Sequence, residues 1–277
     1  MNTGVNSIAM PWQSEMLSAV PGVAHGITRR VEGFGRAHGN VGFSAPRDRE
    51  DAWAMRQGWC AALGLAPEHL VTLGQVHGND VHKVTSNLAG RGARPGSIPV
   101  GLGDSLVTNR AGPVLMTLHA DCQPILFVDP GAGRRGPAVG VAHAGWRGTV
   151  ADVAGATLAL MSSAFGTRAV DVHVCLGPAI GQCCYVVGED VMSAWREQAG
   201  SDANAAIESS GERYRFSLNV ANALLLDRAG VRAANIEVSA ICTRCDSNHW
   251  FSHRGQGPHT GRFGAMVAIR GEPAARR

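Results

Sequence analysis

Three polar side chains stand at the ends of apolar segments that read as strands, in positions where an apolar residue would pack better. They are His77 in LGQVHGNDVHKV, Cys122 in LHADCQPILFVDP and His143 in VGVAHAGWRGTVADV. One thiol and two imidazoles on rigid strand ends would form a three-ligand metal site with an open fourth position. That arrangement is typical of catalytic zinc, not of structural zinc. By ligand type, the same mixed donor set also suits copper.

Cys122 and His143 each have a simpler interpretation, in which they only fill the core. A buried cysteine usually acts as a small apolar residue, and a buried histidine can hydrogen-bond a backbone carbonyl. Asp121 directly before Cys122, with Pro124 soon after it, indicates instead a polar cleft at a strand end. The residues alone leave both interpretations open.

Arg147 follows His143 by four residues, near the start of a predicted helix that Thr149 would cap. A helix N-terminus together with a guanidinium suits an anion such as phosphate. Arg29, beside the glycine-rich loop VEGFGRAHGN, is a second candidate for phosphate binding, and Asp121 is the best candidate to move a proton near the metal. The alternatives are a surface Arg147 paired with a carboxylate, and a solvated basic loop around Arg29.

Other cysteines and histidines fit the metal site less well. Cys242 and Cys245 form a C-x-x-C pair, but Cys183 and Cys184 are adjacent, and vicinal cysteines do not reproduce the spacing of a zinc knuckle. We therefore interpret Cys184 and Cys242 as packing residues near the pocket, with redox or disulfide use as the alternative. His119 lies three residues before Cys122 on a predicted strand, so the two side chains should point to opposite faces. We therefore expect His119 to support the site, and a role as a fourth metal ligand is the alternative.

Composition bounds the class of protein. The 277 residues are 45% apolar, enough for a sizeable core, and the formal charge of +3 with no Lys/Arg run argues against a nucleic-acid surface. Neither a signal peptide nor an apolar stretch long enough to span a membrane is visible. Seven scattered cysteines, an odd number, favour reduced thiols and a cytoplasmic location.

The apolar patterns predict a mixture of strands and helices. Residues 48–63 read as a helix that Asp48 caps and Gly64 ends. Other helices are expected from Thr149 onward and within residues 181–198 and 216–230. Apolar runs predict one strand near residues 21–30 and two strands, joined by a glycine turn, within 70–84. Further strands are predicted near residues 105–110, 113–120, 124–130, 138–145, 169–177, 235–243 and 264–271. We predict a single α/β (α+β) domain with a mixed central sheet layered by helices, spanning 21–270 between an N-terminal extension (1–20) and a C-terminal tail (271–277).

Five ordered motifs carry a family resemblance: QVHGNDV, ADCQPILFVDP, AHAGWRGTV, GPAIGQCCYVVGEDV and the CTRCD, FSHR and TGR words of the C-terminal part. They resemble the bacterial YfiH-like proteins, also called the laccase-domain, polyphenol-oxidase or peptidoglycan-editing-factor family. The resemblance runs from about Pro21 to Ile269. It implies the YfiH-like fold, akin to that of the cytotoxic necrotizing factors.

The resemblance also implies an activity and its residues. The metal ligands would be His77, Cys122 and His143, and the substrate-binding residues Arg29, Asn40, Gln75 and Arg147, with Asp121 and Arg147 catalytic. The implied activity is zinc-dependent phosphorolysis of purine nucleosides (adenosine, inosine, guanosine, methylthioadenosine), with possible adenosine deamination, by a monomer or homodimer. True laccase chemistry is disfavoured, because the sequence has no His-x-His pair to hold several coppers.

Two other functions stay open. Cys122 could be the nucleophile and His143 the base of an amide hydrolase that edits peptidoglycan precursors. Alternatively, the chain could be a zinc-stabilised binding module without catalytic activity. Metal analysis and a thiol-directed probe would separate these hypotheses, because a metal-bound thiolate is masked from alkylation.

Overall fold

The computed structural model describes residues 10–131, 136–210 and 213–271. Its strands form two large mixed sheets and one small sheet. The first sheet has the order β1-β13-β5-β2 and comprises Val23–Ile27, Phe263–Ile269, Val114–His119 and Leu70–Val71. The second has the order β12-β8-β6-β7-β4-β3 and comprises Ile236–Val238, His173–Leu176, Gln123–Asp129, Ala138–Ala144, Ser105–Thr108 and Val81–Lys83. The predicted mixed α/β class is confirmed, and the strands divide between two packed sheets.

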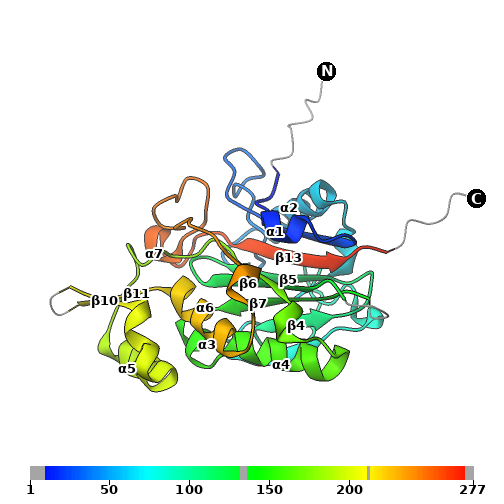
Figure 1. Ribbon diagram of the computed structural model, residues 1–277. Helices are drawn as coiled ribbons and strands as arrows, with labels where there is room; N and C mark the ends of the chain where they lie inside the picture. The colour runs from blue at the N-terminus through cyan, green and yellow to red at the C-terminus, as the bar shows by residue number, and fades with distance from the viewer. Residues whose placement is uncertain (1–9, 132–135, 211–212, 272–277) are drawn as a thin grey trace, which may run out of the picture.

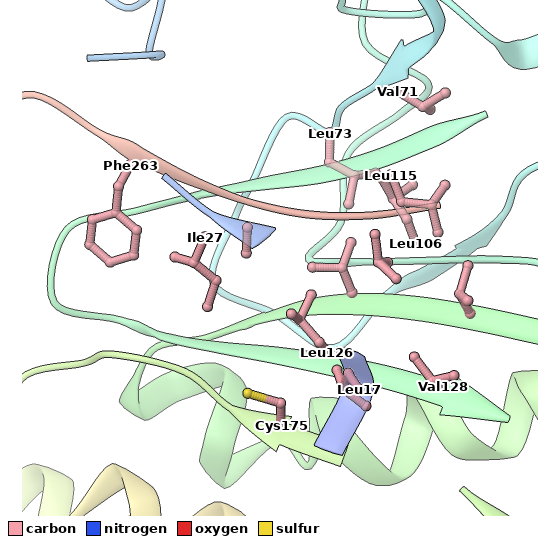
Figure 2. Close-up of a cluster of buried hydrophobic side chains, with 14 of the residues drawn as sticks. Leu17, Ile27, Val71, Leu73, Leu106, Leu115, Leu126, Val128, Cys175 and Phe263 are labelled. Carbon is pink, nitrogen blue, oxygen red and sulfur yellow. The ribbon is translucent and has the colours of Figure 1, made fainter. Parts of the chain in front are cut away.

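The two large sheets pack face to face, and helices cover their outer faces (Figure 1). Alternation along each central strand produces these layers, because successive side chains point to opposite faces. In β6, Leu126 and Val128 join the core between the sheets, shown in Figure 2, whereas Ile125 and Phe127 face the helices. All seven residues of β6 are buried, so this strand is covered on both faces, as is typical of a continuous apolar run.

Helix α2 (Arg49–Leu63) packs on the first sheet. It begins after Asp48, whose carboxylate accepts from the amides of Glu50 and Asp51, both at 3.0 Å. It ends at Gly64, which has a left-handed backbone (φ 65°) that glycine adopts without strain. Both predicted ends of this helix are therefore confirmed. Its buried face (Ala52, Met55, Trp59, Cys60 and Leu63) packs on the first sheet.

Thr149 does not cap the helix that follows β7. Two helices stand there, α3 (Trp146–Val150) and α4 (Val153–Phe165), and the cap of α4 is Asp152, whose carboxylate accepts from the Gly155 amide at 2.9 Å. Asp152 has a left-handed backbone (φ 57°), so it interrupts the helical path between α3 and α4. The predicted cap at Thr149 is therefore wrong, and Arg147 lies inside the five-residue α3.

A smaller unit lies beside the second sheet. It holds α5 (Glu189–Ala199), α6 (Leu218–Arg228) and the three-stranded sheet β10-β11-β9, whose strands are Ile207–Ser210, Arg213–Phe216 and Val186–Val187. Trp195 and Phe216 are fully buried in the separate core between these elements. The short α7 (His253–Gln256) precedes β13.

Residues 10–20, placed by the sequence pattern in an N-terminal extension, pack onto the domain. They include the short α1 (Glu15–Ser18), and Leu17 is fully buried between the sheets. The Ser14 hydroxyl donates to Glu237 of β12 at 2.7 Å. The packed domain thus begins before residue 21, while residues 1–9 and 272–277 lie outside the described residues. Among the described residues, none of the helices combines the length and apolar character needed to cross a bilayer.

Candidate active site

His143 lies near the end of β7, and its imidazole is held by a buried carboxylate. Its Nδ1 is 2.9 Å from Oδ1 of Asp104, the residue that precedes the neighbouring strand β4. The side chain of His143 is 4% exposed and that of Asp104 is fully buried, so solvent does not compete for this contact. Because Nδ1 is engaged, Nε2 is the nitrogen left to face a ligand or a metal.

The same carboxylate also fixes the turn that carries His77. The second oxygen of Asp104 accepts from the amide of Gly78 at 2.7 Å and from that of Val76 at 3.2 Å. His77 between them has a left-handed backbone (φ 63°), which costs about 1–3 kcal/mol for a residue other than glycine. Asp104 thus both orients the imidazole of His143 and fixes the turn that carries His77.

Cys122 is presented by a second strained residue. Asp121 also has a left-handed backbone (φ 86°), at the point where β6 begins. Its carboxylate accepts from the Thr243 hydroxyl at 2.7 Å and from the Arg254 amide at 2.6 Å. These bonds hold the turn that places the Cys122 thiol beside the two histidines.

The three predicted ligand residues come together. One potential ligand atom from each of His77, Cys122 and His143 lies within 4.8 Å of the others. The rings of His77 and His143 meet edge to face, with centroids 4.9 Å apart. Gly145 leaves room for this approach, because a Cβ at residue 145 would lie 2.9 Å from the Cys122 sulfur and 3.1 Å from Cδ2 of His77.

Charge in this group is shared between the thiol and the imidazole. Burial alone would raise the pKa of Cys122, but the imidazoles of His143 and His77 lower it to about 6. Burial alone would lower the pKa of His143, but the Cys122 thiolate and the Asp104 carboxylate raise it to about 9. At neutral pH these values describe a thiolate paired with an imidazolium, so a metal that takes His143 as a ligand would displace its proton.

His119 has its ring nitrogens engaged elsewhere. Nε2 is 2.8 Å from the Thr117 hydroxyl, and Nδ1 is 3.1 Å from the carbonyl oxygen of Cys122. Its ring stacks on Phe263 at 5.5 Å between centroids. Burial, followed by the charge of His143, holds the pKa of His119 well below its usual value. His119 therefore supports the backbone of Cys122, in agreement with the supporting role that we expected.

The three residues open into a cavity of about 880 Å³. Its walls include four arginines, namely Arg49, Arg56, Arg254 and Arg262, and the apolar surfaces of Phe43, Ile98, Ile180 and Tyr185. Asp121 is the single carboxylate among the described residues that line it. Arg56 is buried and donates to the carbonyls of Val41, Gly92 and Ala93. The cavity thus combines flat apolar walls with several cations, which suits an organic substrate together with an anion.

The predicted substrate-binding residues lie in different places. Gln75 lines the cavity, but its amide is paired with Leu118 through two hydrogen bonds of 2.9 and 2.7 Å. The Asn40 amide binds Gly42 and accepts from the Arg262 amide, so it fixes that loop. Arg147 is exposed and lies over the Trp146 ring at 4.4 Å; it is not among the described residues that line the cavity, although its charge acts on Tyr185, which is.

Arg29 is also absent from the described residues that line the cavity. Its Nε is buried and has no hydrogen-bond partner in the part of the chain that the structure describes. Direct contact of Arg29, Asn40, Gln75 or Arg147 with substrate stays a prediction. The sequence interpretation missed the roles of Arg254 and Arg262 in the cavity wall. Both stand in motifs that carried the resemblance, FSHR and TGR, and those words were the available signal.

The site residues fit one metal ion of the zinc or copper type. A thiol and two imidazoles form an accepted donor set for either ion, and the contact from Asp104 to His143 is the usual support for a ligand histidine. A centre with three protein ligands, facing a large cavity, keeps a position for substrate. The fold and site thus define a two-sheet α/β protein with a candidate metal centre that faces a large cavity.

The chain belongs to the family described as multi-copper polyphenol oxidoreductase laccase, which matches residues 24–270. It is 38% identical to the purine nucleoside phosphorylase YlmD of Geobacillus stearothermophilus, over 84% of each chain. It is also 37% identical to the adenosine deaminase RL5 of an unknown prokaryotic organism, over 57% of this chain and 59% of that protein. The crystal structure of the Geobacillus YlmD superposes with a TM-score of 0.85, covering 91% of this chain and 93% of that one.

Proposed function

We propose that this protein is a zinc-dependent purine nucleoside phosphorylase. The observation that carries the proposal is the convergence of His77, Cys122 and His143 at the wall of a large cationic cavity. A relative covering most of the chain is named a purine nucleoside phosphorylase. The reaction joins phosphate to the sugar of the nucleoside and releases the purine base, so the site needs an anion cradle and a flat apolar slot.

Each part of the cavity has a role in this proposal. His77, Cys122 and His143 would hold the zinc ion, which would supply a Lewis acid facing the cavity. Arg254 and Arg262 are the best-placed cations for phosphate, because both line the cavity and Arg262 lies near Cys122 and Asp121. The ring of Tyr185 and the side chain of Ile180 provide apolar surface for the purine.

Adenosine deamination is a second candidate activity. One relative is named an adenosine deaminase, and Asp121 places a carboxylate in the cavity beside Cys122. Hydrolytic deamination of a base needs a carboxylate that moves protons. The bonds from Thr243 and Arg254 leave each oxygen of Asp121 with one free lone pair, so the carboxylate can still accept a proton.

The hypothesis of a cysteine hydrolase also has an observation in its favour. Cys122, His143 and Asp104 form a chain of thiol, imidazole and carboxylate, the order found in enzymes with a cysteine nucleophile. The metal dependence of the activity distinguishes the cysteine hydrolase from the phosphorylase. Zinc would mask the thiolate that a hydrolase must use, whereas the proposed phosphorylase requires zinc.

The test is to incubate zinc-loaded protein with adenosine, inosine, guanosine or methylthioadenosine, with and without phosphate, and to resolve the products. If the protein is a phosphorylase, free base and sugar 1-phosphate should form only when phosphate is present. If it is a deaminase, inosine should form from adenosine without phosphate. Cys122→Ala should abolish both, whereas Cys60→Ala, which alters a core thiol of α2, should abolish neither. Absence of base release with all four nucleosides would rule out the phosphorylase.

A further inference from the structure

A second group of potential ligands lies apart from the metal centre described above. Cys183 and Cys184 precede β9, and Cys242 and Cys245 follow β12, about 60 residues further along the chain. The four sulfur atoms lie within 4.8 Å of one another. The fold therefore brings together a vicinal pair and a C-x-x-C pair whose spacing in the sequence did not predict a common site.

The backbone segments that carry these two pairs are joined through the second sheet. Strands β8 and β12 run parallel, and their pairing continues past the strand ends into a bridge between Ala179 and Cys242. The Thr243 amide donates to the Ala179 carbonyl at 2.9 Å. Both cysteine pairs thus begin a few residues beyond fixed strands, so their proximity results from the sheet.

The separations from the Cys245 sulfur fit those between thiolates around a tetrahedral metal. The Cys245 sulfur is 3.4 Å from that of Cys184 and 3.7 Å from that of Cys183, and all four cysteines are free thiols. Four thiolates around zinc, with Zn–S bonds of about 2.3 Å, place neighbouring sulfurs about 3.8 Å apart. A disulfide instead needs about 2.05 Å between its two sulfurs.

Backbone amides surround the first sulfur of the C-x-x-C pair. The Gly181 amide lies 3.2 Å from the Cys242 sulfur, and the amides of Arg244 and Cys245 also donate to it. Such hydrogen bonds favour a thiolate, because they are made to the charged form. They also form a tight turn around the sulfur, with the Asp246 amide donating to the Cys242 carbonyl at 3.0 Å.

Packing does not explain this cluster. Cys183 and Cys245 are exposed, and Cys184 and Cys242 are only half-buried, whereas Cys60 and Cys175 are fully enclosed in the cores. A free cysteine that serves only as a small apolar residue is expected inside, as those two are. Four converging and partly exposed thiols have instead the donor set of a structural zinc site.

We propose that Cys183, Cys184, Cys242 and Cys245 bind a second zinc ion, which fastens the loop after β8 to the loop after β12. Four thiolates fill the coordination shell of this ion, so it has no open position for substrate. Both loops contribute to the active-site cavity. Tyr185 directly follows the first pair and lines the cavity, and Thr243, between the second pair, holds the carboxylate of Asp121.

Counting zinc per chain by native mass spectrometry tests this proposal independently of any enzymatic activity. The protein should hold two zinc ions, and Cys245→Ser and Cys122→Ala should each hold one. The matched control is Cys175→Ala, which alters a buried thiol outside both groups and should keep two. An unchanged zinc count in Cys245→Ser would overturn the proposal.

A second measurement uses the unaltered protein, in case Cys245→Ser fails to fold. Cys183 and Cys245 are exposed, so in the absence of metal they should react quickly with an alkylating reagent. Zinc should protect both, and a chelator should restore their reactivity, as read from peptide masses. Equal alkylation with and without zinc would contradict the proposal, and so would disulfide-linked peptides from these cysteines in the zinc-loaded protein.

Discussion

Asp104 is the residue on which two of the three proposed active-site ligands depend. One oxygen holds the imidazole of His143, and the other accepts the amides on either side of His77. The hydrogen bonds to His143 and to these amides also lower the pKa of Asp104, against the opposing effect of burial. A carboxylate in this position sets both the orientation and the basicity of a metal ligand.

Asp104→Asn should therefore weaken zinc binding at the active site by about 10–100-fold. Asparagine has one amide oxygen where aspartate has two, so either Nδ1 of His143 or the backbone amides of the turn that carries His77 would lose their acceptor. Competition with a chelator measures the affinity. Asp80→Asn is the matched control, because Asp80 is exposed and two residues from the turn. Equal affinities in the two variants would contradict this role.

Metal-free protein offers a test of the charge shared by Cys122 and His143. The lowered thiol pKa contributes stability that is lost as the pH falls through about 6, and the raised imidazole pKa contributes stability that is lost as the pH rises through about 9. The ion pair should therefore persist between these two values. The alkylation rate of Cys122 should rise with a midpoint near pH 6, and His143→Asn should move that midpoint upward. A midpoint unaffected by this substitution would show that His143 does not stabilise the thiolate.

Among the elements, the start of α3 is the one that limits the space at the metal centre. Gly145 precedes α3 with an extended backbone (φ −72°, ψ 176°), which any residue can adopt, so the need for glycine there is purely steric. A Cβ would press on the Cys122 sulfur and on His77 at 2.9 and 3.1 Å. Neither neighbour can move without disturbing the ligand geometry.

Gly145→Ala should lower zinc affinity by about tenfold or more, because overpacking of this kind costs about 1–3 kcal/mol. The fold should survive, since the clash is confined to the ligands. Zinc affinity and the melting temperature of the metal-free protein separate the two effects. Gly136→Ala serves as control, because its Cβ would meet open space. A large fall in the melting temperature with unchanged zinc affinity would contradict the steric argument.

The helices show which elements a sequence can predict. Both ends of α2 were predictable, because Asp48 and Gly64 are local signals that act within one turn. The start of α4 was not, because Thr149 and Asp152 are both good capping residues. The choice depends on the left-handed backbone of Asp152, which no local pattern reveals.

At the scale of the whole molecule, the fold joins residues that the sequence keeps apart. The continuous apolar runs of β5, β6 and β7 predicted strands, but the division of these strands between two packed sheets depends on long-range pairing. For the same reason, family motifs could select His77, Cys122 and His143, whereas spacing could not assemble the four-cysteine cluster. Arg254 and Arg262 reach the cavity from segments more than 100 residues beyond Cys122.

Metal removal should therefore loosen one region without unfolding the protein. The core between the two sheets and the core beneath α4 contain none of the seven proposed ligands, so their packing does not require metal. We expect far-ultraviolet circular dichroism to be preserved after chelation, while hydrogen exchange rises in the two loops around residues 179–187 and 241–256. Cys122→Ala, which should empty the active site alone, should leave exchange in both loops largely unchanged, and Cys245→Ser should raise it. Global unfolding on chelation would instead mean that the metals hold the entire fold together, as in small zinc-dependent domains.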